Sequence, residues 1–172
     1  MNLPEPGWPR IFSTRFVCAV AMLGPLGRKL PAPGTWGSLA GLLYFLVLFR
    51  HARWEVTVVW TALAGYGAVA FCGDAARRLG KTDPGEVILD EFVVMPLVFL
   101  GWRAGWLAAL PDWTVLLTGF ALFRFYDILK PLGIARLQRW SGGWGIVADD
   151  FAAALAACAT LHLGVGLWAL LR

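Results

Sequence analysis

The sequence predicts an all-α fold, a small integral membrane helical bundle with about four to five apolar segments. Two observations predict it. Of the 172 residues, 59% are hydrophobic and only 15% are charged, which is too apolar for an ordinary soluble domain of this length. Many of the ten tryptophans also lie near the ends of apolar runs, as in the aromatic belts of membrane proteins.

The first 23 residues are expected to form an N-terminal segment, and residues 24–172 the membrane domain. The Pro-rich stretch Met1–Pro9 is predicted to be poorly ordered. Two arginines then precede the short apolar run Phe16–Leu23, which lacks the small-residue cleavage site of a signal peptide. We therefore expect an amphipathic or interfacial helix in this run.

A loop rich in glycine and proline follows and leads into a helix, for which Thr35 is the expected N-cap. Free backbone N–H groups at a helix N-terminus attract anions. The start of this helix is therefore a candidate anion site, and a plain capping turn is the alternative.

Five apolar segments account for most of the remaining chain. They are Trp36–Phe49, Trp54–Cys72, Phe92–Leu110, Trp113–Phe123 and Phe151–Leu171. About 20 residues cross a bilayer core, so the second, third and last segments are long enough, whereas the first and fourth are short.

If all five segments cross the membrane, the polar stretches gather on one side. Eleven of the 15 Lys and Arg residues then lie on that side, which the positive-inside rule makes cytoplasmic. We therefore expect a multi-pass protein with its N-terminus inside. Its active site is expected at the cytoplasmic membrane face.

The stretch from 83 to 91 places four carboxylates directly before an apolar run. Asp83 followed by proline predicts a helix start, with Glu86 at the third helical position. In such a helix Glu86 and Asp90 share one face, and Glu91 lies roughly 100° further round. Their repulsion grows where water is scarce, and Mg²⁺ favours oxygen ligands. The stretch is a candidate magnesium site.

Two further polar clusters are predicted on the same face. Arg124, Asp127 and Lys130 follow one another at three-residue spacing, so they can share a helical face. Asp149 and Asp150 open the last helix after a glycine-rich turn. An interfacial salt-bridge row and an N-terminal cap are the structural alternatives. A buried charge at depth costs at least ~2.5–3.5 kcal/mol, which favours a functional reason for so many carboxylates here.

Four stretches in order carry a resemblance to a known family. They are Pro31-Ala32-Pro33-Gly34-Thr35-Trp36-Gly37-Ser38-Leu39; Asp83-Pro84-Gly85-Glu86 with Asp90-Glu91-Phe92; Phe123-Arg124 with Asp127-Ile128-Leu129-Lys130-Pro131; and Gly142-Gly143 with Gly145 and Asp149-Asp150. Together they resemble the motifs of phosphatidylglycerophosphatase A. Val94, Pro96 and Leu132-Gly133 depart from the family's pattern, which concerns helix packing more than chemistry.

The resemblance implies a Mg²⁺-dependent enzyme of phospholipid biosynthesis in the bacterial inner membrane. Its substrate would be the lipid phosphatidylglycerophosphate, from which hydrolysis of the terminal phosphate gives phosphatidylglycerol. Membrane lipids are expected partners and nucleic acid is not. The sequence leaves open whether the chain forms a homo-oligomer.

Side-chain chemistry fits this interpretation, because a bound metal ion can neutralise a phosphate monoester and activate a water molecule. The expected metal ligands are Glu86, Asp90, Asp149 and Asp150, and the expected catalytic carboxylates are Asp90, Glu91, Asp127 and Asp150. Arg124, with its bidentate fork, and Lys130, as a point charge, are expected to hold substrate phosphate. Thr35 and Ser38, with nearby backbone N–H groups, are expected to hold a second phosphate or the glycerol.

Other mechanisms and function classes fit less well. Cys72 and Arg77 have four residues between them, whereas cysteine phosphatases need five. His51 lies on the opposite side, and His162 lies inside the last apolar segment, so a histidine nucleophile is not expected. A CDP-alcohol phosphatidyltransferase needs a spaced Asp-Gly-Ala-Arg motif that the chain lacks. A small carrier would place its carboxylates near the midplane of long helices.

Overall fold

The described part of the chain, residues 3–103, 107–108 and 110–171 of a computed structural model, contains helices and no strand, as the composition predicts. Its elements are the 3₁₀ turn η1 (Trp8–Ile11), α1 (Thr14–Ala21), α2 (Leu26–Lys29), α3 (Pro33–Tyr44) with the π-helical turn η2 (Phe45–Phe49), α4 (Trp54–Leu79), α5 (Leu89–Val98), α6 (Asp112–Leu129), the 3₁₀ helix η4 (Ile134–Arg139) and α7 (Gly143–Leu170).

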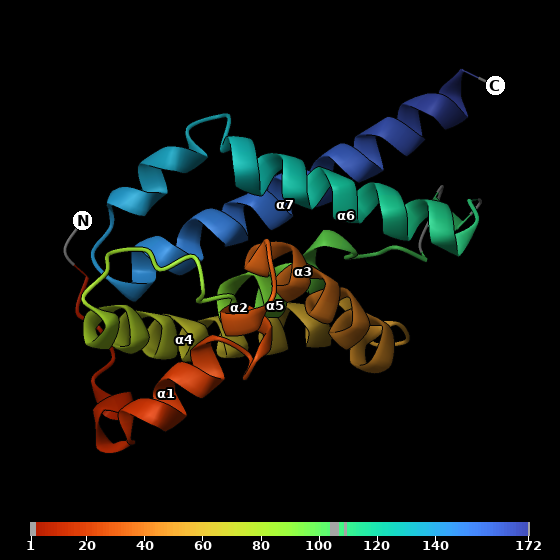
Figure 1. Cartoon of the computed structure of the whole chain (residues 1–172). Helices are drawn as coiled ribbons and strands as arrows, with labels where there is room; N and C mark the ends of the chain where they lie inside the picture. Colours follow the sequence, from red (N-terminus) through yellow and green to blue (C-terminus); the bar gives the residue numbers. More distant parts are fainter. Residues whose placement is uncertain (1–2, 104–106, 109, 172) are drawn as a thin grey trace.

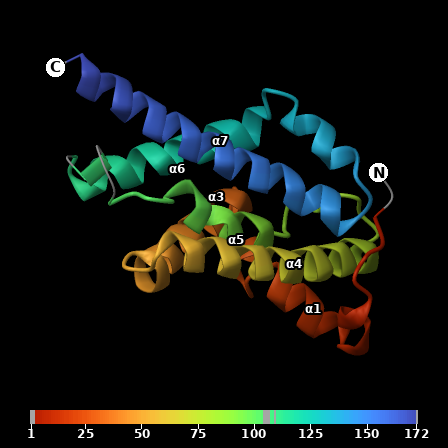
Figure 2. The same cartoon turned by 180° about the vertical axis from the view of Figure 1, so that it is seen from behind.

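The short helix α5 lies at the centre of the bundle (Figures 1 and 2). It packs against α3, α4 and α7, and its apolar side chains from Val93 to Val98 are buried. The acidic stretch leads directly into this helix. Asp90 and Glu91, in its first turn, are therefore drawn into the interior at one end of the bundle.

The prediction of a membrane-spanning helix over Phe92–Leu110 is wrong. α5 ends at Val98, and Gly101 then turns the chain with a φ of 66°. A helix of ten residues is about 15 Å long, half the thickness of a bilayer core. Within the same predicted segment, residues 104–106 and 109 lie outside the described part of the chain.

Two helices, α4 and α7, are long and apolar enough to cross a bilayer, with 26 and 28 residues. α4 continues past its predicted end at Cys72 to Leu79, where Gly80 terminates it with a φ of 66°. α6 runs beside α7 (Figures 1 and 2). By length and composition, α4 and α7 indicate a membrane protein.

Close helix packing around α5 depends on glycine in α3. A Cβ atom at Gly37 would lie 2.9 Å from Cβ of Ile88, and one at Gly41 would lie 2.5 Å from Cγ of Met95. Two small residues four positions apart allow two helices to approach closely, as in membrane helix pairs. This contact seats the start of α3 beside the acidic end of α5.

Hydrogen bonds connect the described part of the N-terminal segment to two helices. Residues 3–9, the described part of Met1–Pro9, bond to α4 and to the start of α7. The helix predicted in Phe16–Leu23 is present as α1, which Ser13 caps and which packs on α4.

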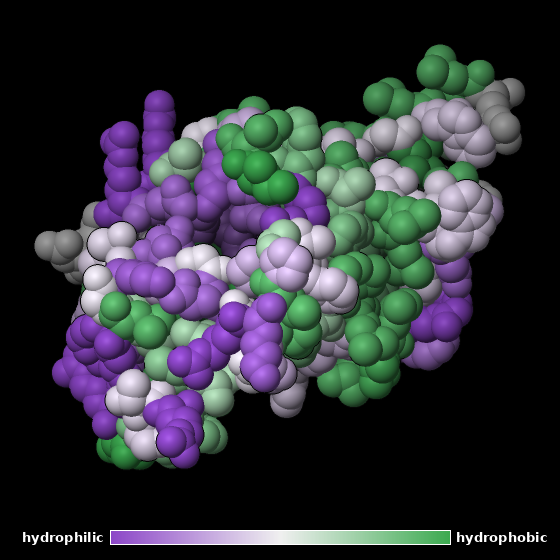
Figure 3. Space-filling model, viewed as in Figure 1, coloured by the Kyte–Doolittle hydropathy of each residue, from purple (hydrophilic) through white to green (hydrophobic). Residues whose placement is uncertain are grey.

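Hydrophilic residues gather at one end of the molecule, around a hollow, and hydrophobic residues cover much of the rest of the visible face (Figure 3). The exposed apolar side chains on α4 include Trp54, Val59, Trp60 and Leu63. In water such a face would be costly, whereas lipid tails would cover it.

Candidate functional site

Five carboxylates from three helices form a cluster at one end of the bundle, which we call the acidic cluster. α5 supplies Asp90 and Glu91, α6 supplies Asp127, and α7 supplies Asp149 and Asp150. Asp90, Asp149 and Asp150 are 3–6% exposed, and the other two side chains are 11–13% exposed. Asp150 interacts electrostatically with the other four. The fold thus unites carboxylates that lie up to 60 residues apart in the sequence.

Burial and neighbouring negative charge raise the pKa values of the two α5 carboxylates. Burial, followed by the charge of Glu91, raises the pKa of Asp90 well above its usual range. Burial, followed by the charge of Asp127, raises the pKa of Glu91 to about 8, although Arg124 lies beside it. The cluster is therefore suited to a positively charged ligand.

Two cationic side chains reach the acidic cluster from the end of α6. Arg124 donates through Nη1 to Asp127 Oδ2 at 2.7 Å and contacts Glu91 Oε1 at 3.4 Å. Lys130 forms an ion pair with Asp149. The prediction that Arg124, Asp127 and Lys130 share a helical face therefore holds for Arg124 and Asp127 only. Lys130 lies beyond the last residue of α6 and pairs with α7.

Ser38 links α3 to this arginine. It is fully buried, accepts a hydrogen bond from Arg124 Nη1 at 3.1 Å and donates one to the carbonyl of Gly34 at 2.8 Å. A Cβ atom at Gly34 would lie 2.1 Å from Oε1 of Glu91, so this glycine lets α3 approach the acidic cluster. Ser38 thereby orients Arg124.

The predicted N-cap at Thr35 is wrong. α3 begins at Pro33, with Ala32 as its N-cap residue, because the fixed φ of proline suits the first helical position. Thr35 lies two residues further along and is partly exposed.

The predicted helix start at Asp83 is also wrong. The chain first makes a hydrogen-bonded turn, and α5 begins only at Leu89. Glu86 therefore does not share a helical face with Asp90. It forms an ion pair with Lys81, and this hydrogen bond lowers its pKa.

Three carboxylate oxygens of the acidic cluster are buried without a hydrogen-bond partner among the described residues: Asp90 Oδ1, Glu91 Oε2 and Asp149 Oδ1. Leaving such atoms unpaired is costly, and oxygens of this kind are the ligands that Mg²⁺ prefers. The donors therefore fit a hard divalent cation in chemistry and charge. In the described part of the chain, no three His, Cys, Asp or Glu side chains converge as a ready-made metal site.

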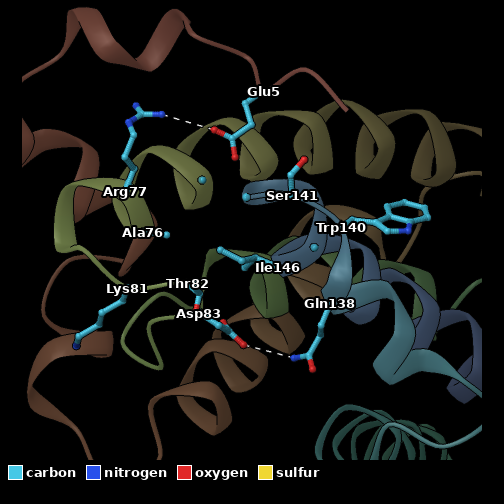
Figure 4. A pocket seen from close by; sticks show the side chains of 13 residues that line it. Glu5, Ala76, Arg77, Lys81, Thr82, Asp83, Gln138, Trp140, Ser141 and Ile146 are labelled. Atoms are coloured by element: carbon cyan, nitrogen blue, oxygen red, sulfur yellow. Dashed lines mark hydrogen bonds and ion pairs between the residues drawn. The ribbon is translucent and has the colours of Figure 1, made fainter. Parts of the chain in front are cut away.

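A cavity of about 640 Å³ opens between the end of α4 and the start of α7 (Figure 4). Asp83 lines it, accepts a hydrogen bond from Gln138 at 3.4 Å, and acts electrostatically on Asp90 and Asp149. The cavity therefore lies next to the acidic cluster. Glu5 reaches it from the N-terminal segment.

The family model of phosphatidylglycerophosphatase A matches residues 19–165, a range that includes the whole acidic cluster. The chain belongs to the phosphatidylglycerophosphatase A family. It is a phosphatase, as the resemblance of its motifs implied.

Three relatives are named for lipid phosphatases. A phosphatidylglycerophosphatase A of Haemophilus influenzae is 38% identical over 73% of this chain and 74% of its own. A phosphatidylglycerophosphatase A of Escherichia coli is 32% identical over 76% and 72%. A Bacteroides thetaiotaomicron protein provisionally named phosphatidylinositol-3-phosphatase is 35% identical over 69% and 74%. No solved structure matches the chain.

Sequence reasoning missed Glu5, Gln138 and Asp74. Glu5 and Gln138 lie outside any local motif, so no pattern could have found them. Asp74 is 3% exposed and pairs with Arg77 and Arg78. Its spacing of three and four residues from the two arginines could have predicted these ion pairs. The phosphatidylglycerophosphatase A match begins at residue 19, so Glu5 also lies outside it.

The cysteines and His162 have structural environments. All three cysteines are free, and Cys18 and Cys72 are buried. His162 Nε2 lies 2.7 Å from the carbonyl of Leu100 inside the bundle. Neither type of side chain supplies an exposed nucleophile near the acidic cluster of this phosphatidylglycerophosphatase A family member.

Proposed function

We propose that the chain is a Mg²⁺-dependent phosphatase that hydrolyses the terminal phosphate monoester of phosphatidylglycerophosphate, giving phosphatidylglycerol and phosphate. The observation that carries the proposal is the acidic cluster, whose buried, unpaired oxygens lie beside Arg124 and Lys130 in a member of a phosphatase family. The names of the Haemophilus influenzae and Escherichia coli relatives support this lipid substrate.

Asp90, Asp149 and Asp150 are the residues that we propose hold Mg²⁺. Bound there, the ion supplies charge neutralisation and an activated water molecule. Glu91, whose Oε2 atom has no partner among the described residues, is the candidate general base. Glu86 has less support as a ligand, because it pairs with Lys81 outside α5.

Arg124 is proposed to bind the phosphoryl group that leaves the lipid. Its Nη1 atom is held by Asp127 and Ser38, while its Nε atom is buried without a partner among the described residues. That free donor, on a guanidinium whose orientation is already set, can bond a phosphoryl oxygen. Lys130 and the partly exposed Thr35 remain candidates for the second phosphate.

The proposed setting is the bacterial inner membrane, with the acidic cluster facing the cytoplasm. The positively charged end of α4, with Arg77 and Arg78 in its last turn and Lys81 just beyond it, lies next to the start of α7. The positive-inside rule places such an end on the cytoplasmic side.

The test is phosphate release from purified protein in lipid nanodiscs. Phosphatidylglycerophosphate, phosphatidic acid, phosphatidylinositol 3-phosphate and a soluble phosphomonoester are compared, each with Mg²⁺ and with EDTA. We expect fastest release from phosphatidylglycerophosphate, and none with EDTA. Faster release from phosphatidylinositol 3-phosphate, or full activity in EDTA, contradicts the proposal.

The same assay tests the site through Asp90→Asn, which keeps the shape of the side chain but removes the charge that a cation requires. Replacing a residue that only supports a metal ligand typically lowers metal affinity or activity about 10–100-fold. For a direct ligand we therefore expect the rate of phosphate release at saturating Mg²⁺ to fall at least about a hundredfold. Asp112→Asn is the control, because Asp112 pairs with Arg50 and Arg103, away from the acidic cluster. Normal activity of Asp90→Asn removes Asp90 from the ligands.

A further inference from the structure

The helix that carries Asp149 and Asp150 begins without a side-chain cap of its own. Its N-cap residue is Gly142, which has no side chain to offer. The first N–H groups of any helix lack partners within it. Here a residue near the start of the chain supplies one partner, because the N–H of Gly143 donates to Oε1 of Glu5 at 3.2 Å.

The turn before α7 is shaped to receive this carboxylate. Gly142 has a φ of 55°, and a Cβ atom there would lie only 1.2 Å from Oε1 of Glu5. Any larger residue would therefore push the carboxylate away. The second oxygen of Glu5 faces Nη1 of Arg77 at 3.6 Å, so its charge is balanced from α4 (Figure 4).

Residues 3–12, which we call the N-terminal strap, are held on both helices. Trp144 Nε1, in the first turn of α7, donates to the carbonyl of Pro4 at 3.1 Å. Arg78 of α4 donates to the carbonyl of Phe12 at 3.0 Å. The strap therefore joins the end of α4 to the start of α7, and Glu5 is its side chain in the cavity beside the acidic cluster.

We infer that Glu5 is a positioning residue, which caps α7 and thereby holds Asp149 and Asp150 in place for the phosphatase reaction proposed above. Asp149 lies six residues after Gly143, about 9 Å along the helix, so fraying of the first turn reaches toward it. The inference rests on the proposed function. It concerns a residue outside the range that the family model matches.

Three substitutions separate the cap from the charge. Glu5→Gln keeps a carbonyl oxygen at the same distance and loses the charge. Glu5→Asp keeps the charge but withdraws the oxygen by one methylene. Glu5→Ala removes both. If Glu5→Ala does not fold, Glu5→Asp still removes the hydrogen bond to Gly143.

The first measurement is amide hydrogen exchange of the full chain in nanodiscs over residues 143–148. Loss of an N-cap typically lowers the equilibrium constant for forming a helix end about fivefold. The amides of residues 143–148 should therefore exchange about fivefold faster in Glu5→Ala and Glu5→Asp. Glu5→Gln should exchange like the wild type. This measurement does not depend on catalysis, so it stands even if the proposed function fails.

The second measurement is the Mg²⁺ concentration that gives half of the maximal rise in Tm, because a ligand of the folded state stabilises it. We expect Glu5→Ala and Glu5→Asp to need several-fold more Mg²⁺, and Glu5→Gln to match the wild type. Glu55→Ala is the matched control, because Glu55 is also a carboxylate bonded to an arginine, Arg53 at 2.8 Å, in the first turn of a long helix.

Three results overturn the inference. Unchanged exchange in Glu5→Ala shows that Glu5 does not cap α7. Faster exchange with an unchanged Mg²⁺ requirement shows that the strap is structural only. Equal losses in Glu5→Gln and Glu5→Ala show that the hydrogen bond to Gly143 is not the cause.

Discussion

Lys130 determines how the charge of Asp149 is compensated. The aspartate is 3% exposed, the lysine side chain is 21% exposed, and the two form an ion pair between the end of α6 and α7. An ion pair of this kind contributes little net stability, whereas removing one partner leaves a buried charge unpaired. A metal ion at Asp149 would take over part of the role of Lys130.

Lys130→Met therefore tests the link between this pair and the metal. Without Mg²⁺, the free energy of unfolding should fall by about 3 kcal/mol, the cost of breaking a buried pair. Added Mg²⁺ should restore most of it and raise Tm more than in the wild type, because Asp149 is then free to bind the ion. Thermal unfolding in detergent micelles at several Mg²⁺ concentrations measures both.

Lys29→Met is the control for this change, because Lys29 is exposed. It should leave Tm and its dependence on Mg²⁺ unchanged. A Lys130→Met protein that shows the wild-type response to Mg²⁺ contradicts a metal ligand role for Asp149.

At the level of helices, the contact of α3 with α5 decides where the site is built. α5 is too short to span a membrane, so its neighbours hold it in place. The approach of α3 brings Ser38 to Arg124 and thereby orients the guanidinium. Loosening this contact should affect both stability and the site.

Gly41→Ala tests the contact. The new Cβ atom would lie 2.7 Å from the carbonyl oxygen of Phe92, which is backbone and cannot easily move. Overpacking of this kind typically costs about 1–3 kcal/mol, so we expect a loss of that size in the free energy of unfolding. Denaturant titration in micelles measures it.

Gly67→Ala is the matched control, because Gly67 is also in a helix and a Cβ atom there would meet nothing within 4 Å. Alanine favours a helix over glycine by roughly 0.5–1 kcal/mol, so this variant should be equally stable or more stable. Equal effects of the two substitutions would show that the crossing of α3 and α5 is not tight.

At the level of the whole molecule, the proposed orientation in the membrane determines which side the acidic cluster faces. A cysteine in place of Gly85 would be exposed, with nothing within 4 Å of its Cβ atom. We expect a membrane-impermeant thiol reagent to label it only from the cytoplasmic side, because the positive-inside rule assigns the positively charged end of α4 to that side.

His51→Cys, in the exposed turn before α4, should be labelled from the opposite side. The unsubstituted protein sets the background, since Cys18 and Cys72 are buried and Cys158 is partly buried. Labelling of residue 85 from outside the cell reverses the proposed orientation.

Much of this protein was predictable from the order and chemistry of its residues. The apolar composition predicts helices. The four motifs predict the family, and four of the five carboxylates in the acidic cluster stand in recognisable pairs, Asp90-Glu91 and Asp149-Asp150. These features are local, because a side chain's chemistry and its neighbours along the chain are written in the sequence.

Only the tertiary structure decided how those residues are arranged. Asp83 and Thr35 have the side chains of good helix caps, yet α5 and α3 begin elsewhere, because a hydrogen-bonded turn and Pro33 determine the helix starts. Glu5 caps a helix that begins 138 residues later. Such contacts depend on which surfaces pack together, and packing is a property of the whole chain that no short stretch contains.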